Sequence, residues 1–419
     1  MDETPLIMVE DDATLLEVCE TLAKEPVIGV DTESDSMHHY QEKVCLIQIS
    51  DSERDYIVDP LKIDDLSPLG AIFADPEKVK IFHGADYDLM CMNRDYGFTI
   101  INLFDTMIAS QFLDLPRVGL ADLCGAYFDA EMDKRYQRHD WAERPLLPEH
   151  LDYARGDSHY LLALRELLIF KLQRLGRWEI VQEEFRLLEQ KNFPVREFSP
   201  DDWIRMKRIG HLEDDDRRVL RHLWRLRDVT ARELDRPPYK VFPDRVLILL
   251  SEKKPTSIES LKRHVRGSST MVRRYGDGMV EAVQKGLEDS DPLPRPPRKA
   301  EKPRYRYSGR EAERLFEQLK DWRKAVISRD RVPMVMVGNN SQLKAVAGER
   351  PEDLEAMSKL DDLRDWQVAH YGEELLEQIA LFESDSSGRK KASKETESKA
   401  PKKRRRRRRK SSDEKTPAS

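Results

Sequence analysis

The segment that organises this chain is Val-Ile-Gly-Val-Asp-Thr-Glu at residues 27–33. Its first four residues are small or β-branched and apolar, which is the composition of a buried strand. The strand ends in Asp31 and Glu33, and residues two apart on a strand point to the same face. Two adjacent carboxylates on a buried strand repel each other and lose hydration, a conflict that a bound divalent cation removes. Taken alone, the segment also fits a strand that runs out into a polar loop.

The segments around this strand predict a mixed α/β domain. Short connections lead to apolar runs at 44–49 and 55–58, which predicts an antiparallel meander. A strand at 79–82 followed by a helix over 85–96 then changes the pattern to alternating strand and helix. Such alternation is typical of parallel strands joined by crossover helices. We also expect a helix over 13–23, ahead of the first acidic strand.

Two further motifs carry residues of the same chemical type. Asp88 is expected in the first turn of the helix after His83, where an acid also stabilises a helix N-terminus by about 0.3–1 kcal/mol. Tyr153 and Asp157 lie four residues apart, in a segment expected to open one long helix through Leu168, so they share a helix face. Seen alone, each motif also fits an ordinary surface.

In this order, the motifs resemble those of ribonuclease D, a family in the tyrosine-containing subgroup of the DEDD 3′-to-5′ exonucleases. The resemblance covers residues 1–195 and implies a ribonuclease H-like fold. It rests on Asp-x-Glu at 31–33, His-x-x-x-x-Asp-Leu at 83–89, Leu-Phe-Asp-Thr at 103–106, Asp-Trp-Ala-Glu-Arg-Pro-Leu at 140–146 and Tyr-x-x-x-Asp at 153–157. The catalytic residues that it implies are Asp31, Glu33, Asp88, Tyr153 and Asp157.

The chemistry of phosphodiester hydrolysis fits these residues independently. Two divalent ions about 3.5–4 Å apart can generate a nucleophilic hydroxide and stabilise the leaving oxygen. Mg²⁺ and Mn²⁺ prefer carboxylate oxygens, and four carboxylates match two dications in charge. The predicted metal ligands are therefore Asp31, Glu33, Asp88 and Asp157, and the resemblance implies that Asp31 bridges both ions. Because an unperturbed tyrosine has a pKa of about 10, we expect Tyr153 to orient the attacking water by a hydrogen bond.

The substrate-binding residues predicted in this domain are His83 and Tyr40. Tyr40 follows two histidines in a polar loop and can stack on a terminal nucleotide. A plain polar loop fits Tyr40 equally, and His83 also fits a residue that caps its strand. Asp35, in the same loop, also fits a member of the acidic site, but we expect it to be solvated.

Residues 210–385 contain an internal repeat with an offset of 96. Identical residues recur without a gap at 223/319, 227/323, 237/333, 241/337, 247/343, 255/351, 275/371 and 276/372. Proline and glycine mark the turns of each mostly helical copy. The first copy, around Arg-Pro-Pro-Tyr-Lys-Val at 236–241, resembles the helicase-and-ribonuclease-D C-terminal (HRDC) domain, and tandem copies behind a nuclease are again similar to ribonuclease D.

Charge separates the two copies. The window 217–288 holds 17 basic and nine acidic residues, whereas the equivalent window 313–384 holds 10 basic and 15 acidic ones. A basic module can follow a phosphate backbone and an acidic one is repelled by it. We expect the first copy to bind nucleic acid, with Arg273 and Arg274 among its contacts, and the second to pack internally or bind a protein partner. Both copies also fit simple spacers.

Composition bounds the remaining expectations. The net charge of −7 combines an acidic body with residues 389–410, where 14 basic residues face two acidic ones. This low-complexity tail is expected to be disordered, and its sequence fits both RNA attraction and a targeting signal. The chain has no run of 18 apolar residues, no signal-peptide pattern at its start and four widely spaced cysteines, so we expect no membrane association and a cytoplasmic location.

The sequence therefore predicts an α/β exonuclease domain with a mixed sheet, followed by two small all-α domains and a basic tail. The expected activity is a metal-dependent 3′-5′ exoribonuclease that releases 5′-mononucleotides from structured RNAs such as tRNA precursors, the substrate resting on the resemblance alone. A 3′-5′ DNA exonuclease and a non-catalytic RNA-binding scaffold are the alternatives. The expected boundaries are 1–195 for the exonuclease domain, 210–290 for the first HRDC domain, 291–307 for a linker, 308–385 for the second HRDC-like domain and 386–419 for the tail.

Overall fold

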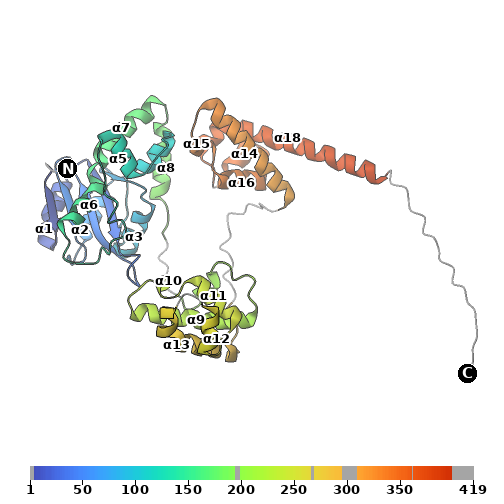
Figure 1. Cartoon of the computed structure of the whole chain (residues 1–419). Helices are drawn as coiled ribbons and strands as arrows, with labels where there is room; N and C mark the ends of the chain where they lie inside the picture. The colour runs from blue at the N-terminus through green and yellow to red at the C-terminus, as the bar shows by residue number, and fades with distance from the viewer. Residues whose placement is uncertain (1–3, 194–198, 266–268, 295–308, 361, 399–419) are drawn as a thin grey trace, which may run out of the picture. The chain divides into compact units, whose positions relative to one another are not determined.

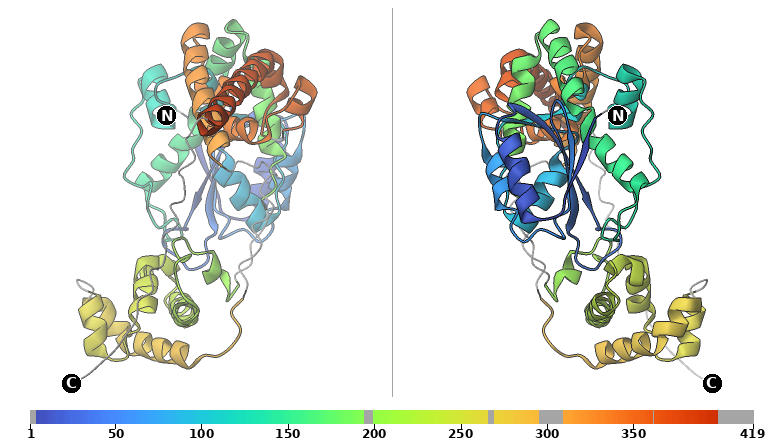
Figure 2. Two further views of the ribbon diagram at one scale, coloured as in Figure 1. Left: turned by 90° about the vertical axis from the view of Figure 1, so that its right-hand side faces the viewer. Right: turned by 90° about the vertical axis from the view of Figure 1, so that its left-hand side faces the viewer.

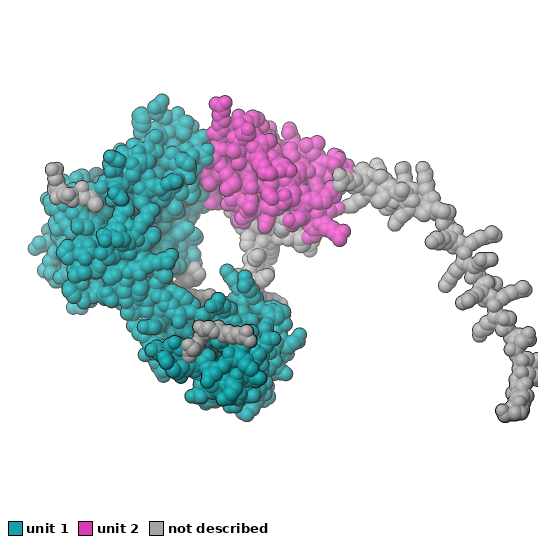
Figure 3. Space-filling model, in the orientation of Figure 1, with its two compact units in different colours: residues 1–302 teal, residues 303–419 magenta. Residues whose placement is uncertain are grey.

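The structure is a computed structural model of the chain (Figure 1). It divides into two compact units, residues 1–302 and 303–419, which are coloured separately in Figure 3. Most of the expected linker and the end of the expected tail lie outside the described residues. The residues that the structure describes are 4–193, 199–265, 269–294, 309–360 and 362–398.

The first part of unit 1 is a six-stranded sheet with helices on both faces (Figure 2). Across the sheet the strands follow the order β1-β4-β3-β2-β5-β6. β3 is antiparallel to both β2 and β4, and the other three strand pairs are parallel. The predicted meander and mixed sheet are thus confirmed. The strands are β1 (Leu6–Val9), β2 (Val27–Ser34), β3 (Val44–Ser50), β4 (Asp55–Val58), β5 (Val79–Phe82) and β6 (Leu103–Asp105).

The central strands are buried because helices cover them. Every residue of β3 is buried, and α6 packs across β2, β3 and β4 while α7 packs on β2 and β5. This arrangement places the carboxyl end of β2 beneath α6. The helices of this part are α1 (Asp12–Leu22), α2 (Ser67–Ala74), α3 (Asp86–Tyr96), α4 (Thr106–Phe112), α5 (Leu120–Phe128), α6 (Pro148–His159), α7 (Leu161–Arg174) and α8 (Trp178–Glu189).

The helix that carries Tyr153 and Asp157 differs from the expectation. It begins at Pro148, where a proline suits the first helical turn, and it ends at His159 instead of continuing through the leucines. The break at Tyr160 has a physical cause, because the last residues of α6 bond to the sheet. Ser158 Oγ lies 2.8 Å from Ser50 Oγ, and His159 Nδ1 lies 3.0 Å from Asp55 Oδ2. A leucine pattern carries no sign of such contacts.

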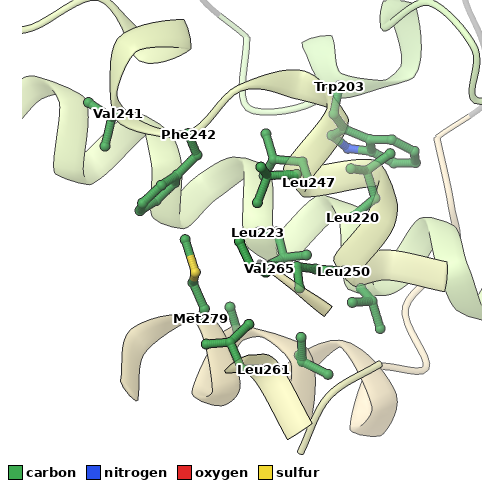
Figure 4. Packing of buried hydrophobic residues seen from close by; sticks show 14 of the residues in the cluster. Trp203, Leu220, Leu223, Val241, Phe242, Leu247, Leu250, Leu261, Val265 and Met279 are labelled. Atoms are coloured by element: carbon green, nitrogen blue, oxygen red, sulfur yellow. The ribbon is translucent and has the colours of Figure 1, made fainter. Parts of the chain in front are cut away.

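The second part of unit 1 is an all-helical bundle around one apolar core. Figure 4 shows the packing of this core, with Trp203, Leu220, Phe242 and Met279 among its members. Trp203 belongs to a short 3-10 helix, so the core starts before the expected boundary at 210. The elements are η1 (Asp202–Arg205), α9 (Asp214–Glu233), α10 (Pro238–Val241), α11 (Asp244–Lys253), α12 (Ile258–His264) and α13 (Ser269–Glu288).

Unit 2 repeats this bundle at the offset that the sequence predicts. Arg227 and Arg323 are both buried, and each donates to the carbonyl 15 residues ahead, that of Phe242 or Gly338. Each also bonds the side chain 17 residues ahead, which is Asp244 or Asn340. The helices of unit 2 are α14 (Arg310–Asp330), α15 (Met334–Val337), α16 (Asn340–Glu349), α17 (Leu354–Ser358) and α18 (Asp365–Ser398).

Glycine repeats with the same packing role. Gly276 lies against Ile258 and Leu261, and Gly372 lies against the equivalent Leu354 and Met357. A Cβ at Gly372 would sit 2.6 Å from a Leu354 methyl, so the Leu354 side chain packs in the space that glycine leaves open. The repeat found in the sequence is therefore also present in the structure.

Three further expectations can be compared with the structure. α18 continues through Ser398, beyond the boundary expected at 385, so the start of the expected tail is helical. The four cysteines are all free and buried. Within the described residues, no helix has the length and apolar character needed to cross a membrane.

Candidate active site

Three carboxylates from two distant segments meet at the carboxyl end of β2. Asp31, Glu33 and Asp157 each place one carboxylate oxygen within 4.8 Å of the others. Asp31 and Glu33 come from β2, and Asp157 comes from α6 above it. Hard divalent cations bind oxygen ligands of this kind, so the donor set fits such an ion. These three of the four predicted metal ligands are thus brought together.

Asp88 is near this cluster but is not one of the three acids whose carboxylate oxygens lie within 4.8 Å of one another. It occupies the first turn of α3, is buried, and accepts a hydrogen bond of 2.5 Å from Thr32 Oγ1. Thr32 lies between Asp31 and Glu33, so this bond ties α3 to the acidic end of β2. Because the negative charge of Asp88 acts on both Asp31 and Asp157, it belongs to the same electrostatic site.

All four acids have raised pKa values, and burial is the largest cause for each. The pKa of Asp31 rises well above its usual range because of burial and the charges of Asp88, Asp157 and Glu33. Burial and the neighbouring acids raise the pKa of Glu33 in the same way, and burial raises those of Asp88 and Asp157 to about 7. Within the described part of the chain, no basic side chain forms an ion pair with any of the four. A bound dication would offset this concentration of negative charge.

The close approach of α6 to β2 depends on Gly29. A Cβ at this position would lie 2.8 Å from the carbonyl oxygen of Ser158, so any larger residue would push the helix away. The helix is also held by Arg155, which bonds to buried Asp55 at 2.6 Å and 3.0 Å. Paired charges of this kind fix the register of α6 over the sheet, and with it the position of Asp157.

Asp105 fixes the turn that leads into α3. Its carboxylate accepts hydrogen bonds from the backbone N–H groups of Gly84 at 3.1 Å and Ala85 at 2.8 Å. The same carboxylate caps α4, accepting from Met107 and Ile108. Gly84 has φ +77°, a left-handed conformation that glycine adopts without strain. This turn sets where α3 begins and therefore where Asp88 lies.

Tyr153 stands on the same helix as Asp157, four residues earlier. Its ring packs against Trp141 with centroids 5.6 Å apart and meets the edge of Tyr136 at 6.0 Å. Burial and the nearby acids Asp157, Glu33 and Asp31 raise its pKa above the usual range. The phenol is therefore protonated near neutral pH and is able to donate a hydrogen bond.

The motif at 140–146 supports this tyrosine. Trp141 is buried, and Arg144 holds the segment by bonding to the carboxylate of Asp59 with two distances of 2.7 Å. Arg144 also donates to the carbonyls of Trp141 and Cys45. The motif thus supplies the Trp141 ring that packs against Tyr153.

His83 lies at the end of β5 and is partly buried. Burial lowers its pKa, so the ring is neutral near pH 7. Its Nδ1 lies 2.8 Å from the hydroxyl of Thr106, and that hydroxyl donates its hydrogen to the carbonyl of Phe82. His83 Nδ1 therefore carries the proton and Nε2 is left as an acceptor. The predicted contact of His83 with substrate stays a prediction.

The loop after β2 contacts the first helical bundle. Tyr40 donates to Asp228 at 2.6 Å, and the Arg232 guanidinium lies 5.5 Å from its ring centroid. His39 lies between Asp235 at 2.6 Å and Asp140 at 3.1 Å. Tyr40, predicted as a substrate-binding residue, lies against α9, and a nucleotide stacked on its ring would share that ring with Arg232. A substrate role for Tyr40 remains a prediction.

Asp35 is a correction to the sequence-based expectation. Instead of being solvated it is fully buried, and the backbone N–H and the ammonium group of Lys43 both donate to its carboxylate. These bonds close the loop that presents His39 and Tyr40. Arg273 and Arg274 lie exposed on α13 and outside the carboxylate cluster. Their predicted contact with nucleic acid is not tested by the structure.

Comparison with known proteins assigns a class to this fold and site. Residues 6–173 match a family model described as 3′-5′ exonuclease. Residues 216–283 and 312–379 both match the HRDC domain, so the second copy is an HRDC domain as well. The acidic cluster lies within the first match. The chain therefore has the domain composition of 3′-5′ exonucleases that carry HRDC domains.

Individual relatives narrow this class. Ribonuclease D of Desulfotalea psychrophila is 32% identical over 70% of this chain and 78% of its own length. The crystal structure of Escherichia coli RNase D is 25% identical, with a TM-score of 0.64 over 90% of this chain and 99% of that one. The exosome exonuclease RRP6 of Saccharomyces cerevisiae is 30% identical over 72% of this chain and 44% of its own.

The chain belongs to the ribonuclease D family, as the sequence motifs predicted. It spans less than half the length of the exosome relatives that it matches.

Proposed function

We propose that this protein is a metal-dependent 3′-5′ exoribonuclease that releases 5′-mononucleotides. The observation that carries the proposal is the cluster of Asp31, Glu33 and Asp157 within 4.8 Å, inside a 3′-5′ exonuclease domain. The match to Ribonuclease D over 78% of that relative supports RNA as the substrate.

The four acids are proposed to hold two divalent cations, Mg²⁺ or Mn²⁺. Such ions would supply an activated water and neutralise charge at the scissile phosphate. A carboxylate oxygen of Asp31 lies within 4.8 Å of those of Glu33 and Asp157, and the charge of Asp88 also raises the pKa of Asp31. This central position supports a bridging role for Asp31. Asp88 would complete the charge balance from α3, held by Thr32.

Tyr153 is proposed to orient the attacking water. Its phenol is protonated near neutral pH and packed in a fixed position against Trp141. A protonated phenol donates a hydrogen bond and does not remove a proton, so its role is orientation. His83 is proposed to accept a hydrogen bond from the substrate at Nε2.

The substrate class is proposed to be the 3′ ends of structured RNAs, including tRNA precursors. The E. coli relative is described as an exoribonuclease involved in structured RNA processing, which supports the proposal. The first HRDC domain exposes Lys262, Arg263, Arg273 and Arg274 on α12 and α13, where they would meet the phosphates of a bound RNA. A protein partner would bind through the acidic second HRDC domain. Buried free cysteines support a reducing compartment, so a cytoplasmic location is part of the proposal.

The test is a nuclease assay with matched 3′-labelled and 5′-labelled RNA and DNA. We expect 3′-labelled RNA to yield labelled mononucleotide first and 5′-labelled RNA to yield a descending ladder, both only with Mg²⁺ or Mn²⁺. Asp31→Asn should abolish both patterns, and Asp64→Asn, which changes an exposed acid, should leave them intact. Degradation that survives chelation and Asp31→Asn would contradict the proposal. A preference for DNA would mean that the substrate is DNA and not RNA.

A further inference from the structure

Gln48 is a buried polar side chain at the centre of β3. Its exposed fraction is 0%, and neither its Nε2 nor its Oε1 has a hydrogen-bond partner among the described residues. Leaving a buried amide unpaired costs about 1–3 kcal/mol. Leu46, two residues earlier and therefore on the same face of β3, is apolar and fully buried, so an apolar residue would suit this position better in a purely structural sheet.

The strand register places Gln48 directly beside a catalytic acid. In the antiparallel pair of β2 and β3, Gln48 is the partner of Asp31. Directly opposed residues project to the same face of a sheet, with Cβ atoms about 4.5–5.5 Å apart. The neighbouring pair of Gly29 and Ser50 identifies that face, because both contact Ser158 of α6. Gln48 therefore lies under α6, on the face that holds the carboxylate cluster.

The chemistry of a primary amide suits this place. Its NH₂ group donates to a carboxylate, whereas its carbonyl oxygen accepts from water. Among the described residues, no side chain donates a hydrogen bond to Asp31, and the titratable groups that act on it are acids that repel it. A neutral donor beside Asp31 can hold its carboxylate without competing for the cation, as a lysine or arginine would.

We propose that Gln48 is a positioning residue for metal binding: its side-chain NH₂, which has no partner among the described residues, donates to the Asp31 carboxylate when the cations bind and holds it in the orientation that binds them. The inference rests on the proposed function, since it assigns a second layer to the same metal site. Gln48 touches neither the cations nor the RNA directly, so its effect reaches the reaction through Asp31.

The experiment measures Mn²⁺ binding to the full chain by isothermal titration calorimetry, alongside thermal unfolding in chelator. For Gln48→Leu we expect about 10-fold weaker Mn²⁺ binding, within the 10–100-fold range typical of residues that orient metal ligands. We also expect the metal-free variant to unfold at the same or a higher temperature, because an unpaired buried amide is removed. A purely structural role would give the opposite pattern, with lower stability and unchanged affinity.

Two control variants separate the possible outcomes. Ile49→Val trims the adjacent residue, which projects to the other face of β3, and should lower stability by about 1 kcal/mol without changing Mn²⁺ affinity. Asp31→Asn should lose Mn²⁺ binding. If the wild type binds Mn²⁺ and Gln48→Leu binds it equally well, the role of Gln48 is refuted and the proposed function stands. If the wild type binds no Mn²⁺ at this cluster, both are refuted.

Discussion

Asp88→Asn should stabilise the metal-free protein at alkaline pH while abolishing its activity. Burial raises the pKa of Asp88 to about 7 from an ordinary value of 3.8. A shift of about three pKa units corresponds to about 4 kcal/mol of preference for the protonated form in the folded state. Because the folded-state pKa is raised, this contribution is fully present below about pH 4 and is lost as pH rises through about 7.

The expected magnitude follows from what asparagine keeps and loses. The amide that replaces the Asp88 carboxylate carries no charge, so most of that cost would disappear at pH 8. The hydrogen bond from Thr32 would weaken when its acceptor becomes neutral, at a cost of about 1.5–3 kcal/mol. We therefore expect a net gain of about 2 kcal/mol at pH 8, which raises the melting temperature of a domain of this size by about 4–8 °C. At pH 5 the gain should be smaller than at pH 8, because the wild-type carboxyl is then mostly protonated in the folded state.

The assay is differential scanning calorimetry of the full chain in chelator at pH 5 and pH 8. The nuclease transition is the one that shifts upward when Mn²⁺ is added to the wild type. Asp64→Asn is the matched control, since it removes an exposed acid and should leave that transition in place at both pH values. An Asp88→Asn protein that melts below the wild type at pH 8 would refute the account of a charge-crowded site.

Three further predictions concern Tyr153, Tyr40 and the first HRDC domain. Tyr153→Phe should lower kcat about 100-fold with unchanged Mn²⁺ affinity, as measured by single-turnover kinetics and calorimetry; a change in affinity alone would argue against an orienting role. Tyr40→Phe should lower the free energy of unfolding by about 1 kcal/mol in chemical denaturation, because the hydrogen bond to Asp228 is lost. An unchanged KM for a short RNA would then show that Tyr40 serves the contact with α9 and does not bind substrate. The double variant Arg273→Gln, Arg274→Gln should weaken RNA binding and reduce the slope of log K against log salt by about 1.4. The control double variant Lys324→Gln, Lys359→Gln in unit 2 should change neither the affinity nor the slope. If filter-binding titrations give the arginine variant the same slope as the wild type, the predicted basic surface does not bind RNA.

Local patterns predicted the parts of this structure that depend on nearby residues. The apolar run at 27–30 with two acids after it is β2, and the runs at 44–49 and 55–58 are β3 and β4 in the expected meander. The helix expected over 85–96 begins one residue later, at Asp86. The spacing of Tyr153 and Asp157 placed them on one helix face, and that helix brings Asp157 to the acidic strand.

The features that sequence reasoning missed depend on contacts between distant residues. Nothing adjacent to Asp35 indicates that it is buried and paired with Lys43, and nothing near Tyr40 in the sequence indicates that its hydroxyl will donate to Asp228. The end of α6 at His159 follows from bonds to β3 and β4 that a leucine pattern does not record. Gln48 did leave a signal, since it is a polar residue inside an otherwise apolar strand, but its pairing with Asp31 required the register.

The most direct test of the metal site is an anomalous difference map from crystals of the full chain soaked in MnCl₂. We predict two peaks about 3.5–4 Å apart, with carboxylate oxygens of Asp31, Glu33, Asp88 and Asp157 as their protein ligands. A well-diffracting Mn²⁺-soaked crystal with no peak at this cluster, or with its peaks bound elsewhere on the chain, would contradict the central claim.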